Sequence, residues 1–142
     1  MKKNIFVIAV FSLLISIFSC SDGGSESPGS IEGKWSFSKY SFTENGYTSP
    51  EEDYDGNEPG CNKNYIEFLP DGVYVEANYY GSECEVDIIY GTWVRNGNVV
   101  TVSLNEEDVK VLKIRSVSPT TLKFVEIDEE EDYKINYILI KE

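Results

Sequence analysis

The chain contains no histidine among its 142 residues, and this absence restricts its possible chemistry. Histidine is the commonest general base and transition-metal ligand, and every Ser-His or Cys-His catalytic pair requires it. Positive charge is also scarce, since 12 Lys and Arg residues stand against 25 Asp and Glu residues and leave a net charge of −13. Such a chain repels phosphates, which argues against nucleic acid as a partner. The acidity either selects a cationic partner or keeps an exposed domain soluble.

The longest apolar run lies at the N-terminus, where Lys2 and Lys3 precede the uncharged segment 5–18. Its 14 residues are too few to cross a hydrocarbon core, which needs roughly 20. The order of basic, apolar and small residues is that of an export signal. Ile17-Phe18-Ser19-Cys20 resembles the lipobox of bacterial lipoproteins, in which the cysteine becomes the first residue and its thiol carries lipid. A soluble secreted protein and a retained signal anchor are the alternatives.

Cleavage before Cys20 divides the chain into a signal peptide, residues 1–19, a tether, residues 20–30, and a domain, residues 31–142. The tether has no aliphatic or aromatic side chain, so it cannot bury enough surface to offset the entropy of ordering. Lipid, including palmitate, on Cys20 predicts a membrane as partner and a cell-envelope location. Ser21 is not the aspartate of inner-membrane retention, so an outer membrane is favoured, with its periplasmic and surface faces both open.

Apolar and polar residues alternate through most of the domain, which is typical of β-strands, and no segment has a long helical period. Pro70-Asp71-Gly72 and Asn96-Gly97 are tight-turn sequences, the second favouring a type I′ hairpin. Such short links require antiparallel neighbours. The connection 43–60 is long enough to hold a turn of helix. The eight expected strands cover residues 34–38, 66–68, 73–78, 86–94, 99–104, 109–117, 121–127 and 133–140.

Eight sequential antiparallel strands predict a closed barrel or a sandwich, and closure removes the exposed edges. Gly33-Lys34-Trp35 resembles the G-x-W motif of lipocalins, whose tryptophan plugs the closed end of the barrel. The resemblance implies an all-β, single antiparallel up-and-down eight-stranded lipocalin-like β-barrel. It departs from the family at the last strand, where Lys134 and Lys141 stand in place of the arginine that packs over the tryptophan. The order of Cys61, Phe68-Leu69-Pro70-Asp71-Gly72, Cys84, Gly91-Thr92-Trp93, Asn96-Gly97-Asn98 and Leu122 resembles the small lipocalin-like lipoproteins of Bacteroidetes.

Two cysteines, Cys61 and Cys84, remain once Cys20 carries lipid, and an even number in an oxidising compartment predicts a disulfide. They lie on either side of the 70–72 turn, just beyond the far ends of the two strands that this turn joins. We therefore expect their α-carbons to approach to about 5.5 Å.

Tyrosine is abundant, with ten residues, and an aromatic ring with a polar tip suits the wall of a ligand cavity. Tyr79 and Tyr90 are the candidate ligand-binding residues. The alternative is that the tyrosines pack in the barrel core and on its outer face. Tyr74 shares its strand face with Glu76, opposite Val75, so some of these side chains point outward in any register.

Two acidic clusters contain the oxygen ligands that calcium prefers. Asp53-Tyr54-Asp55-Gly56-Asn57 resembles the start of an EF-hand loop, but Glu58 and Asn64 occupy the positions that require glycine and glutamate. Only a looser oxygen site of Asp53, Asp55 and Asn57 would remain. Segment 128–132 is expected to be a solvated hairpin tip. No metal, cofactor or catalytic residue is predicted.

These observations predict a non-catalytic, membrane-anchored binding protein of the cell envelope, with a small apolar ligand as its candidate occupant. The alternative is a protein-interaction role, as an accessory or inhibitor domain that uses the connection 43–60 as its contact surface.

Overall fold

The fold is that of a computed structural model, which describes residues 29–106, 108–127 and 133–142. Every regular element in this part of the chain is a β-strand. The ten strands are β1 (Gly33–Glu44), β2 (Tyr47–Thr48), β3 (Glu52–Asp53), β4 (Tyr65–Phe68), β5 (Val73–Tyr80), β6 (Glu85–Asn96), β7 (Val99–Ser103), β8 (Val109–Val117), β9 (Thr121–Ile127) and β10 (Tyr133–Lys141).

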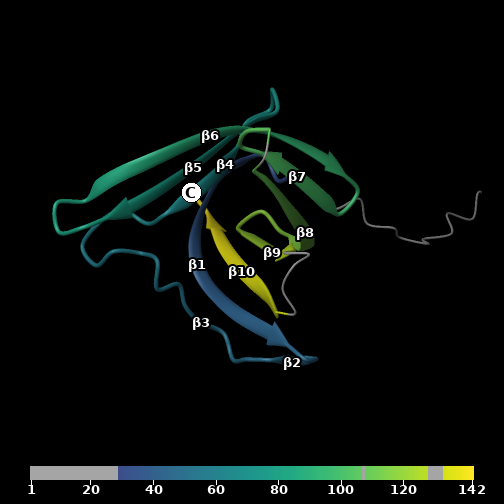
Figure 1. The fold of residues 1–142 in the computed structure, drawn as a ribbon, viewed down its shortest axis with the longest axis horizontal. Coiled ribbons are helices and arrows are strands. Elements are labelled where there is room, and N and C mark those ends of the chain that lie inside the picture. The colour runs from purple at the N-terminus through teal and green to yellow at the C-terminus, as the bar shows by residue number, and fades with distance from the viewer. Residues whose placement is uncertain (1–28, 107, 128–132) are drawn as a thin grey trace, which may run out of the picture.

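Eight of these strands form a closed antiparallel barrel, as predicted (Figure 1). Around the barrel the order is β1, β4, β5, β6, β7, β8, β9 and β10, and β10 pairs with β1 to complete the circle. The closing pairing runs from Trp35 opposite Lys141 to Glu44 opposite Tyr133, with one bulge between Phe37 and Lys39. Each strand therefore has two hydrogen-bonded neighbours, which removes the open edges.

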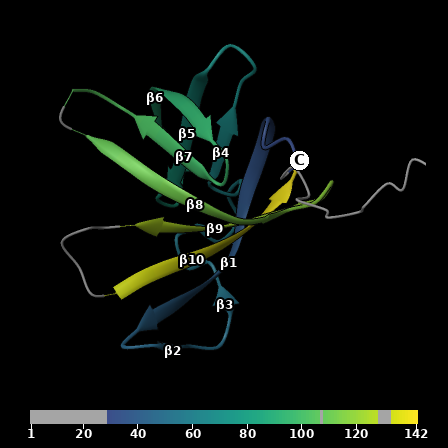
Figure 2. The same cartoon turned by 90° about the vertical axis from the view of Figure 1, so that its right-hand side faces the viewer.

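The long connection after β1 contains β2 and β3, not the helical turn that its length allowed. Strand β4 pairs with β1 only as far as Ser36, and both short strands pair with β1 beyond that residue (Figures 1 and 2). The backbone N–H of Phe42 donates to the Ser49 hydroxyl, and the N–H of Ser49 donates to the Phe42 carbonyl. These bonds hold the segment extended against β1. No helix in the part of the chain that the structure describes could span a membrane.

Antiparallel order places the turns alternately at the two ends of the barrel. The turns after β4, β6 and β8 lie at one end, which we call the closed end. The connection 45–64 and the turns after β5 and β7 lie at the other, which we call the mouth. The hairpin between β6 and β7 was predicted, but its turn is centred on Gly97 and Asn98. Of these two residues only Gly97 has a positive φ, 62°, whereas a type I′ turn requires a positive φ at both. The turn is therefore not the expected type I′ turn on Asn96-Gly97.

The closed end is filled by apolar side chains around Trp35, which is fully buried, as the G-x-W resemblance implied. The Trp35 indole N–H donates to the Ile31 carbonyl at 2.7 Å, and the Lys141 ammonium lies 4.8 Å from the ring centroid. Lys141 thus takes the place that the family gives to arginine. Gly33 has a φ of 113°, and a Cβ there would lie 3.0 Å from Lys141 Cε, which explains the glycine of the motif.

Candidate functional site

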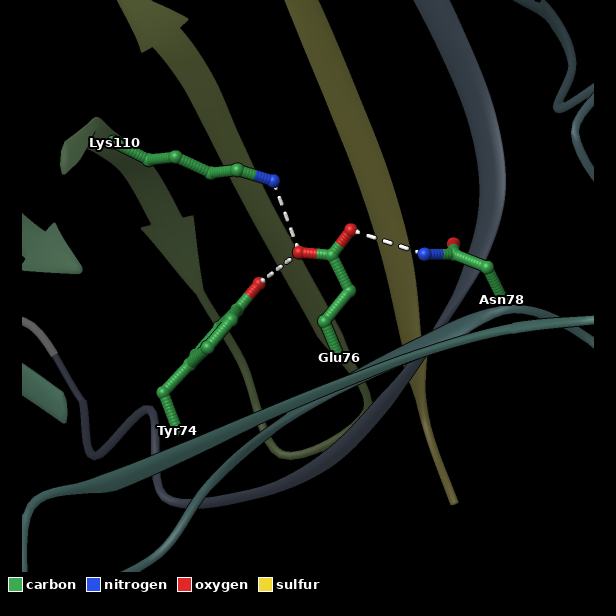
Figure 3. A network of polar contacts seen from close by, with 4 residues as sticks. All are labelled: Tyr74, Glu76, Asn78 and Lys110. Carbon is green, nitrogen blue, oxygen red and sulfur yellow. Dashed lines mark hydrogen bonds and ion pairs between the residues drawn. The ribbon is translucent and has the colours of Figure 1, made fainter. Parts of the chain in front are cut away.

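The inner wall of the barrel carries a polar network formed by Tyr74, Glu76 and Asn78 of β5 and Lys110 of β8 (Figure 3). Alternate residues of a strand share a face, so the three β5 side chains point inward together. Strands β6 and β7 separate β5 from β8 around the barrel wall. A contact between Glu76 and Lys110 must therefore cross the interior, and this places the network inside the barrel.

Glu76 is the centre of the network and accepts three hydrogen bonds. Its Oε2 atom accepts from the Tyr74 hydroxyl at 2.9 Å and from Lys110 Nζ at 3.0 Å. Its Oε1 atom accepts from Asn78 Nδ2 at 3.3 Å. The Glu76 and Lys110 side chains are only 14% and 28% exposed. The network is thus a largely buried ion pair whose carboxylate is satisfied on both oxygens.

Burial and pairing act in opposite directions on the two charges. Burial is the largest single influence on Glu76 and favours its neutral form. The charge and hydrogen bond of Lys110 act in the opposite direction, as do the hydrogen bonds from Tyr74 and Asn78. Together they outweigh burial and lower the pKa of Glu76. Burial likewise opposes the charge of Lys110, and the attraction of Glu76 outweighs it and raises the pKa of the ammonium. Both groups are therefore charged at neutral pH.

Tyr74 stays protonated throughout the physiological range. Burial raises the pKa of its phenol well above the ordinary value, and the Glu76 charge with the hydrogen bond to Glu76 raises it further. The phenol is therefore a fixed donor to the carboxylate. Lys110 has three N–H donors and uses one of them in the hydrogen bond to Glu76. The others can donate to a group that enters the barrel.

An aromatic cluster lies on the mouth side of the core. The Tyr54 ring, from the connection 45–64, stacks on Phe37 at a centroid distance of 4.7 Å and meets the ring of Tyr137 at 6.2 Å. Tyr137 in turn lies 5.3 Å from Phe124. Burial raises the pKa of the Tyr54 phenol, and both Glu76 and Lys110 act on it electrostatically. The Tyr54 phenol therefore lies within electrostatic range of the polar network.

Two asparagines fix the segment that carries Tyr54. Asn57 Nδ2 donates to the Phe37 carbonyl at 2.9 Å, and Asn57 Oδ1 accepts from the Asn64 backbone N–H at 2.8 Å. Asn64, which is buried, donates through Nδ2 to the Gly56 carbonyl and accepts from the Tyr79 backbone N–H. These bonds join the connection 45–64, which we call the mouth segment, to the bulge of β1 and to β5. Asn57 is therefore a structural residue, and its amide is occupied within the protein.

The disulfide between Cys61 and Cys84 is confirmed, with α-carbons 5.3 Å apart. It connects the mouth segment to the turn between β5 and β6. Cys84 adopts a positive φ of 56° in that turn. Together with the asparagine bonds, the disulfide holds the segment over the barrel opening.

The prediction that Tyr79 and Tyr90 line a ligand cavity is wrong. In the register of β5 and β6, Tyr79 lies opposite Val86 and Tyr90 lies opposite Val75, on the wall face opposite to Tyr74 and Glu76. Tyr90 is 65% exposed on this outer face. The physical reason is parity: a shift of one residue moves every side chain to the other face.

The remaining predicted sites have mixed outcomes. Cys20 and segment 128–132 lie outside the described residues. Asp53 faces Lys39 at 3.8 Å and Asp55 accepts a long hydrogen bond from Tyr40. Within the described ranges, no group of three Cys, Asp or Glu side chains is arranged to hold a metal ion.

The pairing of Glu76 with Lys110 was not predicted from the sequence. A signal for it was present in the strand pattern, since Lys110 is in phase with Leu112 and Ile114, which are both buried in the core. A lone lysine in phase with core residues indicates a buried partner of opposite charge. The alternation along β8 did not indicate that the partner, Glu76, would come from β5.

The model of the lipocalin-like domain family matches residues 31–124 of the chain. Among solved structures, a lipocalin-like protein from Bacteroides uniformis is 17% identical with a TM-score of 0.56, and the match covers 80% of this chain and 100% of that one. A protein from Bacteroides eggerthii is 10% identical with a TM-score of 0.53 over the same shares. These two likenesses show the fold alone. No curated protein sequence matches.

Proposed function

Because the chain belongs to the lipocalin-like domain family, as the G-x-W resemblance predicted, we propose that it is a non-catalytic binding protein that holds a small, largely apolar molecule inside its barrel. The observation that carries the proposal is the Glu76–Lys110 pair, which faces the interior beneath the mouth segment. Burying two charges costs several kcal/mol per ion before pairing. Packing alone does not require two charges at this position, whereas binding of a ligand with a polar group would.

The surroundings of the pair define the ligand's chemistry. The rings of Phe37, Tyr54 and Tyr137 form an apolar and polarisable wall that suits an aliphatic or aromatic body. Lys110 offers hydrogen-bond donors at one point on the inner wall. The preferred ligand therefore has an apolar body and one hydrogen-bond acceptor. Entry requires Tyr54 to move, since its ring packs at the mouth.

The cell-envelope location is part of the same proposal and rests on Cys20 and the sequence before it. The described chain enters the barrel at its closed end, where the Gly29 carbonyl accepts from Arg95 Nη1 at 2.8 Å. A lipid anchor at Cys20 would therefore leave the mouth directed away from the tether. Loss of detergent-phase partitioning in a Cys20→Ala variant, measured by Triton X-114 extraction, is the expected result. Unchanged partitioning would contradict lipidation.

Native mass spectrometry of the protein purified from its own host tests the binding function. We expect a stoichiometric small molecule on the wild-type chain and reduced occupancy in a Lys110→Met variant. Glu67→Gln is the matched control, because Glu67 lies on the neighbouring strand and faces outward. If the wild-type chain carries no small molecule and an added apolar amine probe, N-phenyl-1-naphthylamine, gains no fluorescence, the barrel is not a ligand carrier.

A protein-interaction role is the second candidate, and one observation favours it. The outer face of β6 exposes an apolar row formed by Val86, Ile88, Tyr90 and Val94, of which Val94 is 70% exposed. Exposed apolar patches of this kind are typical of protein contact surfaces. This row, in addition to the connection 43–60, is the surface to test. A protein that copurifies and is lost on Tyr90→Lys substitution would support this role.

A further inference from the structure

A second hollow, separate from the barrel interior, lies on the outer wall and has a volume of about 200 Å3. Its floor is formed by neighbouring strands β1, β10 and β9. Ile138 and Lys123 are register partners there, and the residues next to them, Tyr137 and Phe124, turn their rings into the barrel. Ile138 and Lys123 therefore point outward. The hollow therefore opens on the outer face of the wall, while Phe124 and Tyr137, which also line it, turn their rings to the interior.

The connection between β2 and β3 forms the rim of this outer pocket. Thr48 and Glu51 line it from that side. The rim is held in place because the hydroxyls of Thr43 and Thr48 are hydrogen-bonded at 2.9 Å and Ser49 bonds twice to Phe42. The pocket is therefore built between a rigid wall and a tethered segment.

Two cations converge on the pocket in a chain whose net charge is −13. Arg115 reaches it from the bulge of β8, and Lys123 from β9. In the part of the chain that the structure describes, Arg115 has no ion pair. A guanidinium presents a planar fork of donors that matches a carboxylate. The Ser41 hydroxyl adds a further donor on the floor of the pocket.

Lys123 has a carboxylate partner that belongs to the protein itself. Glu51 Oε1 lies 3.6 Å from Lys123 Nζ, and both side chains are about half exposed. Exposed pairs of this kind contribute little, so a competing anion can replace Glu51. We propose that the outer pocket binds a small carboxylate, with Arg115 and Lys123 as its charge partners and Glu51 as an internal competitor for the same place.

The size and lining of the pocket restrict the ligand further. A cavity of 150 Å3 is large enough for benzene, so about 200 Å3 accommodates an aromatic or short aliphatic acid. Ile138 supplies an apolar wall for the body of the ligand. The strongly negative charge of the whole chain opposes the approach of anions, so binding depends on the local cations.

Titration of the full-length chain with benzoate, followed by 1H–15N NMR, tests this proposal. We expect saturable shifts at the amides of Lys123, Asn136 and Ile138. Arg115→Gln should weaken binding by about tenfold, because it removes the charged donors that meet the carboxylate. Glu51→Gln should strengthen binding about threefold, because it removes the competitor.

Lys113→Gln is the matched control, since Lys113 lies on the same strand as Arg115 and does not line the pocket. It should leave the benzoate affinity unchanged. Equal binding of benzyl alcohol, or unchanged binding in Arg115→Gln, would overturn the proposal. Shifts confined to inner-wall residues such as Leu112 would also overturn it, while placing benzoate in the barrel and so supporting the proposed function.

Discussion

The two ends of the barrel are built from the same strands but differ in what they bury: the closed end buries apolar side chains, and the interior beneath the mouth contains a pair of charges. At the closed end, Trp35, Ile31 and Leu139 are buried among apolar neighbours, and the turns are short. At the mouth, a long connection folds over the opening, and the interior beneath it contains the Glu76–Lys110 pair. Apolar burial stabilises a fold without regard to direction, whereas buried charges require partners at fixed positions. The closed end therefore supplies stability, and the mouth supplies specific chemistry.

The largest test of this contrast is Trp35→Ala. Removal of a fully buried indole should lower the free energy of unfolding by about 4 kcal/mol, because it leaves a cavity in the closed-end core. Urea denaturation measures the change. Tyr90→Ala, which removes a mostly exposed ring, is the control and should cost under about 1 kcal/mol. Equal costs would mean that the closed end is not the main source of stability.

Removal of the disulfide by Cys61→Ala with Cys84→Ala tests how the mouth is held. The two cysteines are 23 residues apart, and a loop of that size contributes about 3 kcal/mol in the chain-entropy model. Hydrogen exchange should accelerate in the mouth segment 45–64 and leave the closed end protected. Faster exchange at both ends alike would show that the two regions unfold as one unit.

Lys110→Met tests the buried pair directly. The variant leaves the Glu76 carboxylate without its cation and should lose about 2 kcal/mol at pH 7, less than a fully buried pair would lose because Lys110 is partly exposed. The double variant Glu76→Gln with Lys110→Met should recover most of this. Lys39→Met, which breaks an exposed pair, is the control and should have little effect.

The pH dependence of the same variant has a defined sign. In the wild-type chain the pKa of Glu76 is lowered on folding, so its contribution is present at neutral pH and is lost as the pH falls through that lowered value. Without Lys110, only the hydrogen bonds from Tyr74 and Asn78 oppose the effect of burial, so the pKa of Glu76 is higher in the variant than in the wild-type chain. The variant therefore gains stability relative to wild type on acidification. A difference that does not change with pH would contradict the ion pair.

Gly56→Ala should have the smallest effect, about 1 kcal/mol. A Cβ at this position would lie 2.6 Å from the Tyr54 ring, so the ring must shift. Because burial raises the pKa of the Tyr54 phenol, a displaced ring should titrate at lower pH than in wild type. NMR of the Tyr54 ring carbons measures this. Gly29→Ala, where the nearest atom would be at 3.5 Å, is the control.

The closed end was largely predictable from the sequence. The eight strands, their order and the role of Trp35 follow from alternation, turn residues and one short motif, all of which are local signals. The disulfide followed from counting cysteines and their distance from a turn. Such features need only neighbours in the chain or a single contact.

The mouth was not predictable, because its determinants lie far apart in the chain. Strand β5 is apolar on one face, with Val75 and Ala77, and polar on the other, with Glu76 and Asn78. The polar face turned inward, and Val75 and Ala77 are buried on the outer wall. Alternation alone does not say which face turns inward, and Lys110, the partner of Glu76, lies on a strand that is distant in the sequence. The position of Tyr54 likewise depends on asparagine bonds to β1 and β5.

The seam between β1 and β10 makes the barrel slow to assemble. A chain synthesised from its N-terminus has made β1 almost one hundred residues before β10, its partner across the seam. Until the last strand is free, one edge of β1 has no β10 to pair with and can pair with another chain. Contacts of such high sequence separation also reduce the folding rate. The barrel closes only after β10 has been synthesised, and deletion of β10 would remove the pairing that completes it.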